Sequence, residues 1–377
     1  MLIAQYSLLY ILAFETSCDD TSVALMRDAT LIAMSTRTQL EHDLTGWVVP
    51  EVAARSHANA IFPCIEDVLS EARMTLHDID VIACTEKPWL LPSLLTGMTV
   101  AKTLSLSLGK PLLWIDHIES HIFANYLERD EDAVVFPAVV LTVSWSHTEI
   151  YHWKSLFELE LMGQSRDDAA GEVFDKVSRM MGLGFPGWAK IAKLASEYEG
   201  KIEVWDIRHK AWAMRCQIPD SRFQYQGRLF PQVMLEPDSL DFSFSGIKSA
   251  VKREVDARMM RYEACSMTDT IWPMEGQQVT RLNIEDMREI AYEFEETVTN
   301  ILSKKLLRAI EHTWAHMMLL AGWVSANSKL KAKLQKISEE KKIPFLAPVK
   351  NLYSMDNAAM VGIRAYYEIQ KMNSCTF

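Results

Sequence analysis

Two histidines four residues apart form the most chemically suggestive motif of the chain. His117 and His121 lie in the segment HIESH. Four residues are about one helical turn, so both imidazoles face the same side of a helix and can bind one metal ion. Glu119 lies on another face, which excludes the HExxH arrangement of zinc peptidases. The alternative interpretation is two hydrogen-bonded histidines on a surface helix.

Two other segments bear on a metal site. Asp356 stands where the last predicted helix begins and is free to be a carboxylate ligand, although a plain helix cap is the alternative. His312 and His316 repeat the four-residue spacing at the end of a long predicted helix. Nothing acidic or turn-like follows this second pair, so we expect it to be structural.

Three further segments suit a nucleotide. The turn Ser144–Thr148 joins two predicted strands, and its backbone N–H groups can cradle phosphate, although an ordinary hairpin turn is the alternative. Asp175 lies in a helix that opens with acidic residues and can bind a ribose hydroxyl, unless that helix is merely capped and solvated. Asn327 follows the buried strand predicted at 317–321, where open α/β sheets bind ligands.

The elements that position these residues repeat. Strands predicted at 10–15 and 22–27 flank a polar turn, and strands at 138–144 and 148–153 do the same. Such a repeat indicates two similar α/β lobes that place both turns against one ligand. Further strands are predicted at 30–35, 79–84, 111–115, 156–162 and 317–321, and helices at 48–72, 91–108, 117–126, 169–183, 188–199, 245–262, 284–312, 327–340 and 356–371.

Composition limits the class of protein. The chain has 377 residues, 49% hydrophobic and 24% charged, with a net charge of −11. These values indicate a globular protein of about two domains and argue against nucleic-acid binding through a broad basic face. The six cysteines form no CxxC pair, which favours a reduced, cytoplasmic chain. No apolar run reaches the ~18 residues of a membrane span, and the start lacks a basic region typical of a signal peptide.

Together and in this order, the motifs resemble the family of tRNA N6-threonylcarbamoyladenosine synthases (TsaD or Gcp, formerly called O-sialoglycoprotein endopeptidase). The resemblance extends over nearly the whole chain apart from an insertion at 201–237. The matching segments are ETSCDD (15–20), GWVVPEVAARSH (46–57), HIESH (117–121), VSWSHT (143–148), DDAAGEVFDK (167–176), FPGW (185–188), DFSFSGIK (241–248), AGWVSAN (321–327) and DNAAM (356–360).

The resemblance implies a fold and an activity. The fold would be α/β, with duplicated actin-like ATPase (ribonuclease-H-like) lobes around a central nucleotide cleft. The lobes would span 1–130 and 131–356, with the last helix, 357–377, packed back on the first. The enzyme would be an acyltransferase that moves the threonylcarbamoyl group from threonylcarbamoyl-AMP to N6 of adenosine 37 in tRNAs reading codons that begin with A. Its partners would be a TsaB-like paralogue and a TsaE-like ATPase.

The resemblance also assigns site residues. One Fe²⁺ per subunit is implied, with Zn²⁺ not excluded by the ligand types. The implied metal ligands are His117, His121 and Asp356. The implied adenylate contacts are Thr142, Val143, Ser144, Trp145, Ser146, Asp175, Trp188 and Asn327. The catalytic acids would be Asp19 and Asp20, although Asp20 is one methylene shorter than the family's usual Glu.

Tryptophan replaces glycine at several family positions. These positions are Trp47, Trp89, Trp114, Trp145, Trp188 and Trp323. Glycine there allows a positive φ or a close approach of backbone to phosphate, whereas an indole would fill the nucleotide space. Glycine makes up 14 residues and tryptophan 11, and counting both as glycine approaches the usual ~7%. We therefore favour UGA codons that the source organism reads as glycine.

Two competing functions belong to other classes. A catalytically inactive paralogue acting as a scaffold would have no reason to keep His117, His121 and Asp356. A sugar or acetate kinase of the same fold would need a phosphoryl-transfer base and Mg²⁺ in place of a histidine pair. A run of lysines at 329–342 suggests a modest phosphate-binding face, for which a solvated helix face is the alternative.

Overall fold

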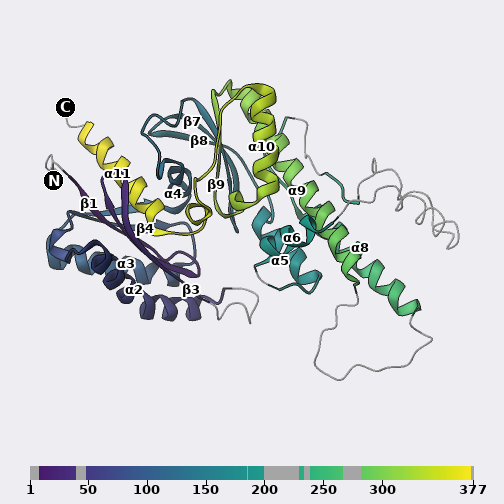
Figure 1. Cartoon of the computed structure of the whole chain (residues 1–377), viewed down its shortest axis with the longest axis horizontal. Helices are drawn as coiled ribbons and strands as arrows, with labels where there is room; N and C mark the ends of the chain where they lie inside the picture. The colour runs from purple at the N-terminus through teal and green to yellow at the C-terminus, as the bar shows by residue number, and fades with distance from the viewer. Residues whose placement is uncertain are drawn as a thin grey trace.

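The computed structural model describes residues 8–39, 48–184, 186–198, 229–232, 238–265 and 282–374, without the side chains of 261–265. Most of the predicted insertion at 201–237, together with Trp47 and Phe185 of the family motifs, lies outside the described residues. The described part forms two five-stranded sheets with helices packed around them (Figure 1).

The first sheet contains the first predicted hairpin. Its strands are β1 (Tyr10–Glu15), β2 (Asp20–Arg27), β3 (Thr30–Thr38), β4 (Val81–Lys87) and β5 (Leu112–Asp116), in the order β3-β2-β1-β4-β5. β1, β2 and β3 pair antiparallel, whereas β1–β4 and β4–β5 are parallel. β2 starts two residues earlier than predicted, because its first residues already pair with the end of β3.

The second sheet repeats this arrangement. Its strands are β6 (Ala138–Val143), β7 (Thr148–Ser155), β8 (Glu158–Gln164), β9 (Met317–Ala321) and β10 (Phe345–Leu346), in the order β10-β9-β6-β7-β8. β6, β7 and β8 pair antiparallel, and β6–β9 and β9–β10 are parallel. The same order and directions occur twice, which confirms the predicted duplicated actin-like fold. The sequence did not predict β10, since two residues are too few to show a period.

The helices agree with the predicted ranges to within a few residues at their ends. They are α2 (Pro50–Ala72), α3 (Leu91–Leu108), α4 (His117–Phe123), α5 (Ala170–Met180), α6 (Gly187–Ser196), α8 (Ser245–Cys265), α9 (Ile284–Thr313), α10 (Ser328–Lys341) and α11 (Ala358–Ser374). Short 3₁₀ turns follow α4 at Ala124–Tyr126 and β9 at Trp323–Ala326 (η4). No helix among the described residues has the length and apolar composition needed to cross a bilayer.

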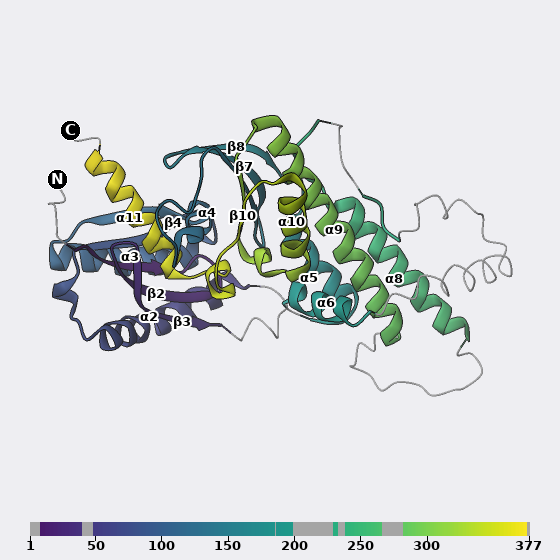
Figure 2. The same cartoon turned by 45° about the horizontal axis from the view of Figure 1, so that its top comes forward.

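Alternating strand residues divide the core into three clusters. Leu12 and Phe14 of β1 pack toward α2 and α3, whereas Ile11 and Ala13 pack toward α11, because successive side chains of a strand point to opposite faces. α2 and α3 therefore cover one face of the first sheet and α11 the other (Figures 1 and 2).

The second sheet is divided in the same way. Val139 and Leu141 of β6 pack with α5, α6, α8 and α9, and Ala138 and Val140 join the cluster that contains α4 and α11. α4 and α11 thus lie in a core shared by both sheets. This arrangement brings the start of α4 and the segment before α11 together.

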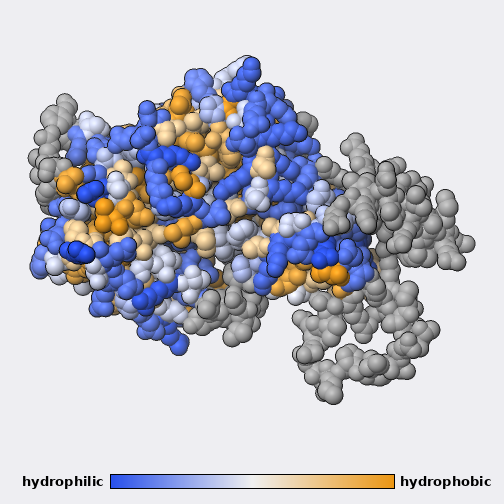
Figure 3. Space-filling view, in the orientation of Figure 1, coloured by the Kyte–Doolittle hydropathy of each residue, from blue (hydrophilic) through white to orange (hydrophobic). Residues whose placement is uncertain are grey.

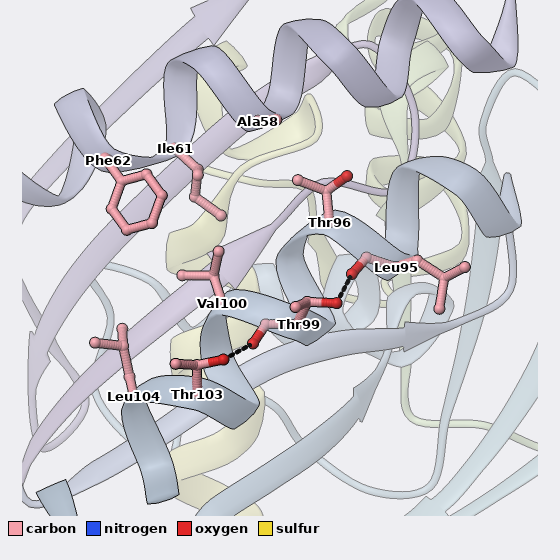
Figure 4. Close-up of a pocket in the computed structure, with 9 residues that line it drawn as sticks. All are labelled: Ala58, Ile61, Phe62, Leu95, Thr96, Thr99, Val100, Thr103 and Leu104. Atoms are coloured by element: carbon pink, nitrogen blue, oxygen red, sulfur yellow. Dashed lines mark hydrogen bonds between the residues drawn. The ribbon is translucent and has the colours of Figure 1, made fainter. Parts of the chain in front are cut away.

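A groove of about 540 Å³ lies between α2 and α3. Phe62 and Leu95 border it and are 56% and 49% exposed. The Thr99 and Thr103 hydroxyls donate to carbonyls one turn earlier in α3, so the lining is mainly apolar (Figure 4). None of the predicted site residues lines this groove.

Candidate metal and nucleotide site

The buried histidine pair stands at the start of α4. Asp116, the last residue of β5, caps this helix through Oδ1, which accepts from the backbone N–H groups of Ile118 and Glu119 at 2.9 and 3.1 Å. The cap fixes the direction in which α4 leaves the sheet. His117 and His121 follow one turn apart on the inner side of the helix, and both are fully buried.

Asp356 completes a three-residue group. Its Oδ1 lies 3.1 Å from Nε2 of His121 and 3.6 Å from Nε2 of His117. The three ligand atoms lie within 4.8 Å of one another, and within the described ranges no other cluster of His, Cys, Asp and Glu meets this criterion. His312 and His316 are therefore not part of such a group.

The donor set fits a divalent transition metal. Two imidazoles and a carboxylate are typical ligands of Fe²⁺ and Zn²⁺. Nδ1 of His121 is buried without a hydrogen-bond partner among the described residues. Burial lowers the pKa of His117, but the charges of Asp356 and Glu15 outweigh burial and raise it to about 9. These two carboxylates thus favour a positive charge at this point, which a metal ion would supply.

Asp356 is not a helix cap. The capping residue of α11 is Asn357, whose Oδ1 accepts from the backbone N–H of Met360 at 3.0 Å. The plain-cap alternative is therefore wrong for Asp356, whose carboxylate faces the histidines.

Trp89 covers Nε2 of His117, the nitrogen that lies nearer Asp356. Its indole Nε1 donates to Nε2 of His117 at 3.2 Å. Its ring stacks on that of Trp145, with centroids 5.6 Å apart and planes at 28°. Trp89 also has a φ of +142°, a backbone conformation that favours glycine and strains an L side chain. The two stacked indoles thus connect the His117–His121–Asp356 group to the turn between β6 and β7.

The turn between β6 and β7 is tightly closed. The backbone N–H of Ser144 donates to the carbonyl of His147 at 2.7 Å, and the N–H of His147 donates back to Oγ of Ser144 at 3.1 Å. Oγ of Ser146 lies 2.9 Å from Nδ1 of His147. The predicted contacts Thr142 and Val143 are fully buried just before the turn. The Thr142 hydroxyl is without a hydrogen-bond partner among the described residues.

The start of α5 packs directly on this turn. A Cβ on Gly171 would lie 2.6 Å from the carbonyl oxygen of Ser144, so only glycine fits there. The backbone N–H of Glu172 donates to the carbonyl of Trp145 at 2.9 Å. The N–H of Ala170 likewise donates to Oγ1 of Thr148 at 2.9 Å. The dipole of a helix N-terminus beside a hairpin turn still favours an anion such as the phosphate of a nucleotide.

Asp175 connects the turn between β6 and β7 to the start of α6. Its Oδ1 accepts from the backbone N–H of Gly187 at 2.6 Å, and its Oδ2 accepts from Nε1 of Trp145 at 2.5 Å. Burial raises the pKa of Asp175 to about 6. The Trp145 indole thus occupies one oxygen of the carboxylate that the sequence predicts to bind a ribose hydroxyl.

Trp188 and Trp323 lie together beyond Asp175. Their ring centroids are 6.3 Å apart, and both indole nitrogens are buried without a hydrogen-bond partner among the described residues. Such an orphaned donor costs roughly 1–3 kcal/mol. Asn327 follows η4 and is buried; its Oδ1 caps α10 through the N–H of Leu330, and its Nδ2 donates to Glu295 at 2.7 Å. Both polar atoms of the Asn327 side chain are therefore used within the protein.

The first hairpin turn is electrostatically linked to both parts of the site. Asp19 and Asp20 are 9% and 7% exposed. Burial and the charge of Asp19 raise the pKa of Asp20 to about 7. The charge of Asp19 also raises the pKa of Asp175, and the charge of Asp356 raises that of Asp20. Asp19 is therefore within electrostatic range of Asp175, and Asp20 within range of Asp356.

Sequence reasoning missed two residues of this site. Glu15, at the end of β1, is fully buried with Oε2 3.1 Å from Nδ1 of His117. The sequence signal that could have identified Glu15 is a single acidic residue at the end of an apolar strand. His147 packs edge-on against Trp89 with centroids 5.9 Å apart, and burial lowers its pKa to about 4. The sequence placed His147 in the turn, but it did not show that the imidazole packs inward against Trp89.

The lysine-rich helix α10 is largely neutralised by acidic neighbours. Lys329 and Lys333 lie 3.1 and 2.8 Å from carboxylate oxygens of Glu296, and Lys341 lies 3.8 Å from Glu311. The surface over α10 is hydrophilic (Figure 3). These ion pairs favour the solvated helix face over a phosphate-binding one.

Comparison with known proteins identifies the family. The family model described as TsaD, tRNA N6-adenosine threonylcarbamoyltransferase, matches residues 30–363. The chain belongs to this family. It is similar to the tRNA N6-adenosine threonylcarbamoyltransferase of Staphylococcus haemolyticus, with 36% identity over 96% of this chain and 91% of that protein. It is also similar to that of Bacillus licheniformis, with 37% identity over 96% and 95%.

Two solved structures resemble this threonylcarbamoyltransferase family member at lower sequence identity. Full-length HypF in its phosphate- and nucleotide-bound form is 13% identical, with a TM-score of 0.48 over 96% of this chain and 55% of that one. YeaZ from Pseudomonas aeruginosa is 19% identical, with a TM-score of 0.30 over 44% and 68%. The family membership makes the protein a transferase.

Proposed function

We propose that the protein transfers the threonylcarbamoyl group from threonylcarbamoyl-AMP to N6 of adenosine 37 in tRNAs reading codons that begin with A, with release of AMP. The observation that carries this proposal is the placement of the His117–His121–Asp356 group next to the turn Ser144–Ser146. One side of the site suits a metal and the other a nucleotide, so a single ligand with a phosphate and an acyl group can contact both.

The adenylate half of the donor would lie in the second lobe. The backbone N–H groups of Trp145 and Ser146 would bind the phosphate, with the dipole at the start of α5 favouring its negative charge. Asp175 would accept a hydrogen bond from the ribose once its Oδ2 is not held by an indole. The positions of Trp188 and Asn327 would border the base.

The reaction forms one bond and breaks another. The N6 amine attacks the carbonyl carbon of the carbamic–phosphoric anhydride, the carbon–oxygen bond to phosphate breaks, and AMP leaves. We assign the amine proton to Asp19, with Asp20 beside it. An Fe²⁺ ion held by His117, His121 and Asp356 would polarise the acyl oxygen, and Zn²⁺ suits the same ligands. The two lobes would hold donor and acceptor in reacting geometry.

We further propose that the natural protein has glycine at the family positions occupied by tryptophan. Trp89 has a glycine-like φ of +142°, and the indole nitrogens of Trp188 and Trp323 are buried and orphaned among the described residues. Trp145 occupies the ribose-facing oxygen of Asp175. By contrast, Trp153 is fully buried and packs among aromatic rings such as Phe123, as a true tryptophan would.

The decisive experiment is peptide mass spectrometry of the protein made by its native organism, covering 143–148 and 185–190. Glycine masses at 145 and 188 would support an open nucleotide site and an active transferase. Tryptophan masses would contradict this proposal and favour the inactive scaffold. Transfer of a labelled threonylcarbamoyl group to tRNA, compared between chains with glycine and with tryptophan at these positions, then tests the activity itself.

The remaining assignments rest on family membership. We propose tRNA, a TsaB-like paralogue and a TsaE-like ATPase as partners, and the cytoplasm as location. We also propose lobes at 1–130 and 131–356, with 357–377 returning to the first; the packing of α11 on β1 and β2 supports this division. Co-purification of the tagged chain with the two proteins from its native cells would test the partners.

A further inference from the structure

The buried carboxylate of Glu15 stands directly behind the histidine pair. Its Oε2 lies 3.1 Å from Nδ1 of His117 and accepts from the Thr85 hydroxyl at 2.6 Å. Its Oε1 accepts from the backbone N–H of Ser17 at 2.6 Å. Glu15 is fully buried and does not belong to the His117–His121–Asp356 group. Three contacts therefore fix a carboxylate against the far side of a candidate metal ligand.

The contacts of His117 identify its tautomer. An indole nitrogen only donates, so the 3.2 Å contact from Trp89 requires Nε2 of His117 to be an acceptor. The neutral ring then carries its proton on Nδ1 and donates it to Glu15. The carboxylate of Glu15 only accepts, so the contact with Glu15 by itself also places a proton on Nδ1. This is also the form in which Nε2 can bind a metal.

We propose that Glu15 is the positioning residue of the metal site. Its carboxylate accepts the Nδ1–H of His117, holds the ring in one orientation, and strengthens Nε2 as a donor. His121 has no such contact, because its Nδ1 has no hydrogen-bond partner among the described residues. His117 is therefore the candidate ligand whose ring is held by a second hydrogen bond. Loss of the Glu15 carboxylate should weaken metal binding by about 10- to 100-fold. This inference rests on the metal site of the proposed function.

The test uses Co²⁺ alone as the probe, in the full chain with Trp89→Gly as the reference protein, because the indole of Trp89 covers Nε2. Glu15→Gln is added to this reference, since glutamine keeps the volume and removes the charge. We expect a dissociation constant for Co²⁺ about 10- to 100-fold higher, with shifted visible absorption bands of the bound ion. Glu149→Gln is the matched control; its carboxylate is held by Tyr151 and should leave both readouts unchanged.

Thr85→Val provides a second variant that keeps Glu15 but removes one hydrogen bond that orients it. We expect this variant to bind Co²⁺ several-fold more weakly. If Glu15→Gln fails to fold, Thr85→Val provides the test in its place. Unchanged affinity and spectrum in the folded variants would overturn the role of Glu15 while leaving the metal site in place. If the reference protein takes up no Co²⁺, the metal site of the proposed function fails, and the role of Glu15 fails with it.

Discussion

Replacement of Trp89 by glycine tests whether the indole is foreign to its position. With a φ of +142°, the backbone of Trp89 lies where an L residue costs roughly 1–3 kcal/mol. Glycine removes this strain. It also removes the stack on Trp145, worth about 1 kcal/mol, and the hydrogen bond to His117, worth about 1 kcal/mol. Added chain flexibility costs up to about 1 kcal/mol more.

The gains and losses nearly cancel, so the free energy of unfolding of Trp89→Gly should stay within about 2 kcal/mol of the parent. Trp153→Gly is the matched control, because Trp153 is fully buried in β7 and has no positive φ. Its replacement should cost at least about 4 kcal/mol through the cavity it leaves.

Urea unfolding of the two variants and the parent gives these free energies, and Co²⁺ titration of the same samples measures access to His117. We expect Co²⁺ binding only after Trp89 is removed. If Trp89→Gly were as destabilised as Trp153→Gly, or if the parent bound Co²⁺ equally well, the reasoning about Trp89 would be refuted.

Three further predictions concern other positions. In a chain that has glycine at positions 47, 89, 114, 145, 188 and 323, Asp356→Ala should lower metal binding and transfer activity by more than about 100-fold with intact fold, since it removes a direct ligand; full activity would contradict the assignment. Trp314→Gly should raise the free energy of unfolding by about 1 kcal/mol, because Trp314 ends α9 at φ +54° and is 83% exposed; a loss in urea unfolding would count against it. Asp20 has a folded pKa of about 7 against 3.8, so the folded chain binds the extra proton and stability falls as pH rises from about 4 to 7, by at most about 4 kcal/mol. Asp20→Asn should flatten this fall, and urea unfolding at pH 4 and pH 8 measures it.

Local signals in the chain were sufficient for much of the fold. Apolar runs bounded by polar turns gave both hairpins, and the helix at 91–108 agrees with α3 at both ends. The four-residue spacing of His117 and His121 correctly placed them on one side of α4. These features depend on neighbours in sequence, and period and spacing record them directly.

Contacts between distant segments required the tertiary structure. Asp356 meets His121 across more than 200 positions because α11 returns to the first sheet and packs beside α4. The contacts of Glu15 and Trp89 with the ring of His117 join residues at or just after the ends of three strands, β1, β4 and β5. No local pattern encodes such meetings, since they follow from the way strands and helices pack.

The sequence by itself therefore determined the type of each element and the chemistry each motif can offer. Only the tertiary structure decided which side chains face one another and which are already occupied, as Trp145 occupies Asp175 and Asn327 caps α10. The physical reason is that residue type fixes what a group can bind, whereas burial and hydrogen bonding, which are set by packing, determine whether it remains available.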